Sequence, residues 1–153
     1  MMEAKVKPGA VAPAERAFHA QVREAMGAVM AARGLRLLSG GPEGIATVAN
    51  ARCWVKLQLH GDREVSCCLY DVVGGGIYDL RGYLRLVGYE CLNQNLQNSP
   101  NYRTLVGIGA ALGSAVLDGP LCGDFSWAAD YWLLVEELRD LRREVVPVLR
   151  RGA

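Results

Sequence analysis

The sequence predicts an α+β domain with an antiparallel sheet, because strand-like and helix-like segments are grouped along the chain and do not alternate. Short apolar and alternating segments, separated by glycine-containing turns, fill residues 35–71, whereas the flanking regions have apolar residues at helical spacing. We therefore expect an N-terminal helix, a sheet of about four strands over residues 35–71, and three C-terminal helices over residues 79–97, 102–116 and 125–146.

The first helix is predicted over residues 14–33 and ends before Gly34, since glycine commonly follows a helix in a left-handed conformation. Residues 1–13 are rich in alanine and proline and lack the apolar run of a signal peptide. We therefore expect a flexible leader followed by a single domain over residues 14–150. The helix has one apolar face, formed by Phe18, Val22, Met26, Val29 and Met30.

A β-hairpin is predicted from two alternating segments, residues 53–60 and 64–71, which are separated by a three-residue loop. A loop of this length pairs residues whose numbers add up to 124, so that Leu59 faces Val65. This register places the apolar side chains of both strands on one face, and a shift by one residue would oppose apolar to polar side chains. We expect this hairpin at the centre of the sheet.

The C-terminal helices are predicted from their apolar stripes. Asp79 is expected to cap the first of them, in which Gly82 and Gly88 are unfavourable residues. The last helix has acidic residues early and arginines late, which suits the helix macrodipole, and Pro147 is expected to end it. Its stripe is the longest in the chain and consists of Trp127, Tyr131, Leu134, Val135, Leu138, Leu141 and Val145.

The charge balance argues against nucleic acid and membrane partners. Among 153 residues, 17 Lys and Arg residues balance 16 Asp and Glu residues, which gives a formal net charge of +1. The longest weakly polar stretch, residues 105–117, is too short to span a bilayer core of about 30 Å. The five cysteines, with Cys67 and Cys68 adjacent, form a poor disulfide framework, so we expect a cytoplasmic protein.

No catalytic residue, cofactor site or metal site is predicted. The adjacent Cys67 and Cys68 and the isolated His60 lack the ligand spacing of zinc sites, and Cys68 is too far along the strand to bond His60 directly. The glycines of residues 107–113 look like a dinucleotide-binding fingerprint but follow a helix, which favours close helix packing instead. Residues 74–76 lack the Lys-Ser/Thr of a phosphate-binding loop and are expected to connect the sheet to a helix.

The polar face of the hairpin is the candidate binding surface, because the register places Trp54 directly opposite Tyr70 on it. Three interpretations stay open: a cross-strand pair that only stabilises the sheet, aromatic anchors of an interface, or a face partly covered by a C-terminal helix. Asn and Gln residues gathered over 93–101 form a second candidate polar edge. The candidate partner-binding residues are Trp54, Lys56, Gln58, His60, Glu64 and Tyr70.

We expect a small cytosolic protein that binds another protein and performs no catalysis. Bacterial immunity proteins, which neutralise a toxin, are similar in size and organisation, so by this analogy of architecture the partner would be a toxin. A homodimer is a further expectation, formed through the helix with Gly109 and Gly113 or through the last helix. The alternative is a small-molecule-binding domain or enzyme with an apolar pocket between sheet and helices. The expected lining residues of that pocket are Trp54, Tyr70, Tyr83 and Trp127.

Overall fold

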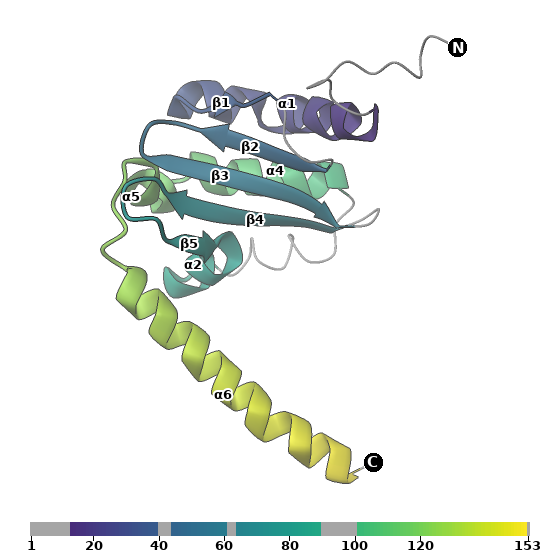
Figure 1. Ribbon diagram of the computed structural model, residues 1–153, viewed down its shortest axis with the longest axis vertical. Coiled ribbons are helices and arrows are strands. Elements are labelled where there is room, and N and C mark those ends of the chain that lie inside the picture. Colours follow the sequence, from purple (N-terminus) through teal and green to yellow (C-terminus); the bar gives the residue numbers. More distant parts are fainter. Residues whose placement is uncertain (1–12, 40–43, 61–63, 90–100, 153) are drawn as a thin grey trace.

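The computed structural model describes residues 13–39, 44–60, 64–89 and 101–152, and it confirms the α+β class (Figure 1). An N-terminal helix precedes the sheet and further helices follow it, as the sequence predicts. The expected leader, apart from Pro13, lies outside the described residues. The elements are α1 (Pro13–Arg33), β1 (Arg36–Leu37), β2 (Ile45–Ala49), β3 (Cys53–His60), β4 (Glu64–Asp71), β5 (Ile77–Asp79), α2 (Leu80–Leu86), α4 (Asn101–Gly113), η2 (Ala115–Leu117), α5 (Asp118–Leu121) and α6 (Ala128–Gly152).

The sheet is an antiparallel meander in which the strands follow one another in the order β1-β2-β3-β4-β5. The central hairpin of β3 and β4 has the predicted register, from Cys53 opposite Asp71 to His60 opposite Glu64. The alternation of apolar and polar residues selects this register, because only one face of each strand packs against helices. The sheet has five strands, one more than expected.

The additional strand, β5, follows a tight turn that the sequence analysis took for a passage from sheet to helix. The Asp71 carboxylate accepts hydrogen bonds from the backbone N–H groups of Val73 (3.1 Å) and Gly74 (2.9 Å). Gly75 has a φ of 82°, a left-handed conformation that glycine adopts without steric cost. The chain therefore folds back on β4, and Ile77 pairs with Tyr70.

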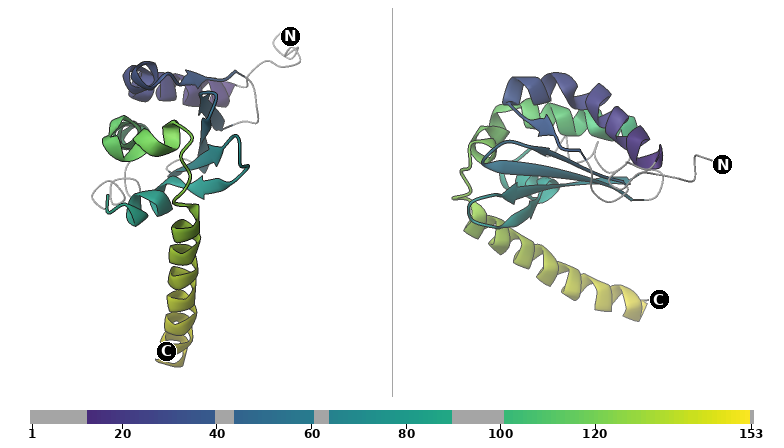
Figure 2. Two further views of the ribbon diagram at one scale, coloured as in Figure 1. Left: turned by 90° about the vertical axis from the view of Figure 1, so that its left-hand side faces the viewer. Right: turned by 45° about the horizontal axis from the view of Figure 1, so that its top comes forward.

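The helices α1, α2 and α4 pack on one face of the sheet and leave the other face open (Figure 2, left). α4 lies directly against α1, and a Cβ added at Gly113 would come within 2.9 Å of Val29 Cγ2. The glycines of residues 107–113 therefore serve the close helix packing that the sequence analysis favoured. The largest fully buried side chains come from α1, the sheet and the helices that cover it: Phe18, Met26, Leu57, Leu69, Leu80, Leu84, Leu105, Ile108, Leu112 and Leu117.

The first C-terminal helix is much shorter than predicted, since α2 ends at Leu86 and residues 90–97 lie outside the described residues. Gly88 has a φ of 81°, so the glycine that was expected to weaken the helix instead follows its C-terminal end in a left-handed conformation. The helix begins where the sequence places it, because the Asp79 side chain accepts a hydrogen bond from the backbone N–H of Arg81 (2.7 Å).

The later helices also differ from their predicted bounds. α4 ends at Gly113 instead of residue 116, and two short helices, η2 and α5, follow it over residues 115–121. α6 begins at Ala128 and continues past Pro147 to Gly152. A proline removes one backbone hydrogen bond from a helix interior, and this loss has not ended α6. Figure 1 shows α6 projecting away from the rest of the protein.

No single helix among the described residues combines the length and the apolar content that crossing a membrane requires. Two consecutive helical segments, residues 104–113 and 115–121, meet those criteria together by length and composition alone, and the bend between them is 71°. Its apolar side chains Leu105, Ile108 and Leu112 are fully buried in the core, which explains the apolar composition of this pair.

Candidate functional site

The described helices cover the sheet on one side only, so alternate residues of every strand point to a surface that no described helix covers, which we call the open face. On β3, Val55 and Leu57 face the helices and are fully buried, whereas Trp54 and Lys56 are exposed. α6 packs beside α2 and does not form the cover that one interpretation expected. The strand residues of the open face are Arg36, Ile45, Thr47, Ala49, Trp54, Lys56, Gln58, His60, Glu64, Ser66, Cys68, Tyr70, Ile77 and Asp79.

Trp54 and Tyr70 form a stacked pair across β3 and β4 on this face, with ring centroids 5.3 Å apart and an interplanar angle of 28°. The pair therefore contributes to sheet stability, as the first interpretation holds. Trp54 nevertheless keeps 41% of its surface exposed, and its indole N–H donates to no other residue in the described part of the chain. An exposed ring with a free donor can bury area and form a hydrogen bond with a partner.

Polar side chains surround the aromatic pair on the same two strands. Lys56, His60 and Glu64 are exposed, and His60 Nε2 lies 2.8 Å from Ser66 Oγ. Lys56 forms no ion pair or hydrogen bond with any residue that the structure describes. With the half-buried Gln58, the structure places all the predicted partner-binding residues on one face.

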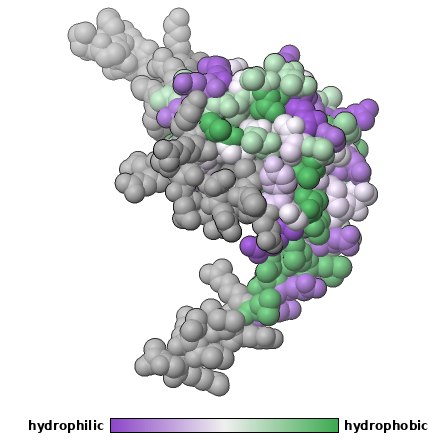
Figure 3. Space-filling view, turned by 180° about the vertical axis from the view of Figure 1, so that it is seen from behind, coloured by the Kyte–Doolittle hydropathy of each residue, from purple (hydrophilic) through white to green (hydrophobic). Residues whose placement is uncertain are grey.

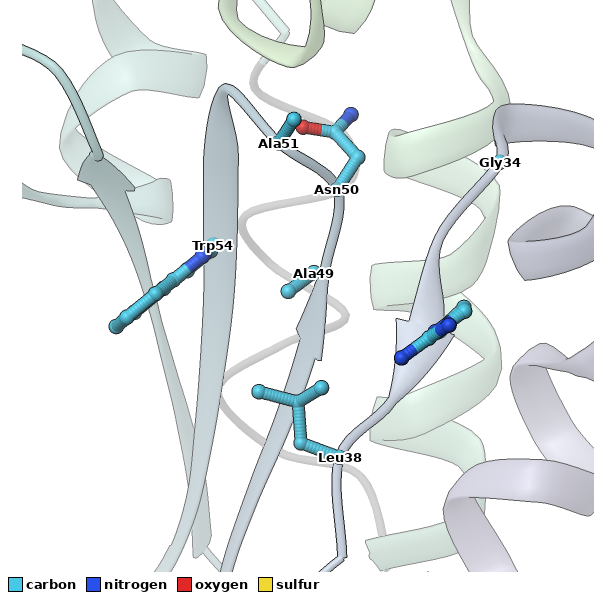
Figure 4. Close-up of a pocket in the computed structure, with 7 residues that line it drawn as sticks. Gly34, Leu38, Ala49, Asn50, Ala51 and Trp54 are labelled. Atoms are coloured by element: carbon cyan, nitrogen blue, oxygen red, sulfur yellow. The ribbon is translucent and has the colours of Figure 1, made fainter.

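A hollow of about 450 Å³ opens on this face beside Trp54 (Figure 4). The register explains it, because Ala49 lies between Arg36 and Trp54 across three neighbouring strands, and its small side chain leaves a gap between the two long ones. Leu38 and Asn50 also line the hollow. The Arg36 guanidinium forms no hydrogen bond or ion pair with the described residues, and it flanks the gap together with the indole ring of Trp54.

The rim of the hollow is held in place by Asn50, which follows β2. Its Oδ1 accepts hydrogen bonds from the backbone N–H groups of Arg52 (2.8 Å) and Cys53 (2.8 Å), and its Nδ2 donates to the Leu121 carbonyl (2.9 Å). These bonds fix the turn that leads into β3 and tie it to α5. The polar atoms of Asn50 are therefore engaged in shaping the site, and among the described residues Arg36 and Trp54 are the lining residues whose side-chain donors have no partner.

The thiols of the sheet are poorly placed for nucleophilic chemistry. Burial, together with the nearby Asp79 carboxylate, raises the pKa of the Cys68 thiol, which disfavours the reactive thiolate. Burial raises the pKa of Cys53 to about 12. His60 bonds Ser66 and is not a base for Cys68. Among the described residues, no group of three or more His, Cys, Asp or Glu side chains is arranged to hold a metal ion.

The glycine-rich turn after β4 does not offer its amides to a phosphate. The backbone N–H groups of Val73 and Gly74 already donate to the Asp71 carboxylate, which occupies the place that an anionic ligand would take. The turn therefore has a structural role in forming β5.

The aromatic residues that were expected to line a pocket between sheet and helices do not come together. Trp54 and Tyr70 lie on the open face, whereas Tyr83 and Trp127 pack on the helix side with ring centroids 4.5 Å apart. The ring centroids of Trp127 and Tyr78 lie 4.9 Å apart, in an aromatic cluster at the start of α6. The hollow thus lies on the opposite side of the sheet from the expected pocket.

Sequence reasoning missed two contributors to the open face, Arg36 and Ile77, because both belong to very short edge strands. The alternation of Arg36 with the buried Leu35 and the half-buried Leu37 was a usable signal. Ile77 is 57% exposed beside Tyr70 and extends the apolar surface. The candidate polar edge over residues 93–101 lies, apart from Asn101, outside the described residues.

Comparison with known proteins returned no match to any protein family, curated protein or solved structure. The geometry of the open face therefore carries the functional argument.

Proposed function

We propose that this protein is a non-catalytic binding module that docks another protein on the open face of its sheet. The observation that carries this proposal is the stacked pair of the exposed Trp54 and the half-buried Tyr70 on a sheet face that the described helices leave uncovered. Aromatic side chains are enriched at the centres of protein interfaces, and charged residues are enriched at the rims. Lys56 and Glu64 supply such a rim.

The hollow beside Trp54 supports the same proposal, because it can receive a side chain of the partner. The guanidinium of Arg36 favours a carboxylate, and the indole of Trp54 favours a planar or cationic group. A partner residue inserted there would contact Arg36 on one side and Trp54 on the other. The surrounding contacts would exclude water from it.

For the partner we propose a toxin that this protein neutralises inside the cytoplasm. This proposal rests on the analogy of size and organisation with immunity proteins. The free thiols of the described residues, including the exposed Cys122, support a reducing compartment.

A small molecule bound in the hollow is the second candidate, since its volume of about 450 Å³ lies within the range of roughly 300–1,000 Å³ that is usual for ligand sites. The two candidates depend on different residues. A small ligand needs Arg36 and Trp54 but not Lys56, which lies outside the hollow, whereas a docked protein would contact all three.

The test is capture of a partner from extracts of the native organism with tagged wild-type protein, followed by affinity measurement with the purified partner. We expect Trp54→Ala to weaken binding by roughly 30-fold or more, which corresponds to a hot spot of about 2 kcal/mol. Lys56→Glu should also weaken protein binding.

The matched control is Trp132→Ala, which removes an equally large side chain of similar exposure (48%) from α6. This variant should bind as the wild type does, and all variants should keep the wild-type melting temperature within a few degrees. Equal binding by wild type and Trp54→Ala would contradict the proposal. Loss with Arg36→Ala but not with Lys56→Glu would favour a small ligand.

A further inference from the structure

The helix α6 carries an apolar stripe that the protein itself does not cover. Tyr131 is buried and Val135 packs against the core, so the first turns of α6 are attached to the body. Beyond them, Leu138 is 38% exposed and Leu141 is 56% exposed. Figure 3 shows apolar side chains gathered along this part of α6, below the body of the protein.

Leu134, Leu138 and Leu141 lie on one side of α6 and form a stripe. At 100° per residue, Leu134 and Leu141 lie within about 60° of Leu138 around the helix axis, whereas Leu133 lies about 140° away. The steps from Leu134 to Leu138 and Leu141 are four and three residues, the heptad spacing of paired helices, and Val145 continues it in the sequence. A partner helix with the same spacing of apolar residues could bury a stripe of this kind.

The charges of α6 identify the partner. Residues 128–138 contain three carboxylates and no basic residue, and residues 139–152 contain five arginines and two carboxylates. The two halves therefore carry formal charges of −3 and +3. The change of sign lies after residue 138, close to the midpoint of the stripe over residues 134–145. A helix with this pattern is complementary to a second copy of itself that runs in the opposite direction.

We propose that two copies of this protein associate through α6 as an antiparallel helix pair. The acidic half of each helix then lies along the basic half of the other, and this favourable contact occurs twice. In a parallel pair, each half would lie against a half of the same charge. The antiparallel pair opposes Leu138 of one copy to Leu141 of the other and places the two bodies at opposite ends of a helix pair about 37 Å long.

This inference concerns a different surface from the open face and does not rest on the proposed function. The stripe on α6 includes no residue of the open face, so the two surfaces can be tested separately. The glycines Gly109 and Gly113, the other expected seam, contact α1 of the same chain and take no part.

The first test is sedimentation equilibrium of the full chain over a wide range of concentrations. We expect the mass to rise from the 16.6 kDa of one chain to twice that value. Leu138→Asn should restore the mass of one chain at concentrations where the wild type is dimeric. Leu133→Asn is the matched control, because it removes an equally large and more exposed leucine (57%) on the other side of the helix, and it should leave the dimer intact.

The second test distinguishes the two orientations by salt. Screening weakens attraction between the opposite charges of an antiparallel pair, so the dissociation constant should rise severalfold when ionic strength increases from about 0.1 M to about 1 M. A constant that falls with salt would indicate a parallel pair and overturn the orientation. A wild type that stays monomeric throughout, or a dimer that survives Leu138→Asn, would overturn the proposal.

Discussion

The backbone N–H of Asp79 donates a hydrogen bond of 2.8 Å to the phenolic oxygen of Tyr131, which lies 52 residues further along the chain. Asp79 ends β5 and caps α2, and Tyr131 lies in the first turn of α6. The Tyr131 ring also meets the edge of Tyr78, with centroids 5.2 Å apart and planes at 90°. The Tyr131 side chain thus connects β5, at the edge of the sheet, to the first turn of α6.

Replacing Tyr131 with Phe should therefore destabilise the protein although the ring is kept. The change leaves a partly buried backbone N–H without its acceptor, which costs about 1–3 kcal/mol of unfolding free energy. Urea denaturation followed by circular dichroism measures this loss. Tyr70→Phe is the control, because no hydrogen bond of the Tyr70 hydroxyl is found among the described residues, and it should change stability by less than about 0.5 kcal/mol.

The contact between Gly82 and Tyr131 gives a second prediction. A Cβ at Gly82 would lie 2.7 Å from Tyr131 Cε2, and that ring is held by its hydrogen bond and by Tyr78. Gly82→Ala should therefore lower the unfolding free energy by about 1–3 kcal/mol, despite the better helix propensity of alanine. Gly27→Ala in α1, where nothing lies within 4 Å of the added Cβ, should raise it by about 0.5–1 kcal/mol. Stabilisation by both changes would show that the Tyr131 ring is mobile.

The buried thiol of Cys53 predicts a loss of stability in alkaline solution. Burial raises its pKa from 9.0 to about 12, so the unfolded chain loses this proton first as the pH rises. The unfolding free energy should therefore fall with rising pH between 9.0 and about 12, by at most about 1.4 kcal/mol per pH unit for this group. Denaturation curves at pH about 8 and about 10 measure this fall in the unfolding free energy. The fall should be about 1.4 kcal/mol smaller for Cys53→Ala than for the wild type. Equal pH dependence in both proteins would contradict the prediction.

The hairpin shows why part of the fold could be predicted. The alternation of apolar and polar residues along β3 and β4 can be read from the local sequence. Once the loop length fixes the register, paired residues lie on the same face of the sheet, as Val55 and Leu69 do. The same alternation places Trp54 and Tyr70 together on the other face. Whether a helix covers that face depends on packing between distant segments, which no local pattern records.

The predicted and observed elements differ mainly where one or two residues determine how the chain turns. β5 has three residues, too few for a pattern, and it exists because Asp71 and Gly75 turn the chain back. Gly88 could weaken a helix or end it, and only its φ of 81° distinguishes the two. Arg36 joined the site because its two-residue strand pairs with β2 on the side of Trp54.

Arg33, the last residue of α1, forms three hydrogen bonds with the segment that contains the end of α4 and the start of α5. Its Nε donates to the Leu112 carbonyl (2.9 Å), its Nη2 donates to the Ser114 carbonyl (2.7 Å), and its Nη1 lies 2.6 Å from Asp118 Oδ1. Carbonyls at a helix C-terminus lack partners within the helix, so the guanidinium provides a donor for the Leu112 carbonyl of α4. The Ser114 carbonyl also accepts a hydrogen bond from the backbone N–H of Leu117 (3.2 Å). The Asp118 side chain is 60% exposed, and ion pairs in such positions contribute little, about 0–1 kcal/mol.

We therefore expect the carbonyl bonds to outweigh the ion pair at this position. Arg33→Ala should lower the unfolding free energy by about 1.5–3 kcal/mol, because charged hydrogen bonds to two carbonyls are lost. Asp118→Ala should cost less than about 1 kcal/mol. Arg33→Lys retains the charge but not the planar fork that reaches both carbonyls, so its loss should resemble that of Arg33→Ala more than that of Asp118→Ala. Urea denaturation ranks the three variants, and a lysine variant as stable as wild type would show that charge alone matters there.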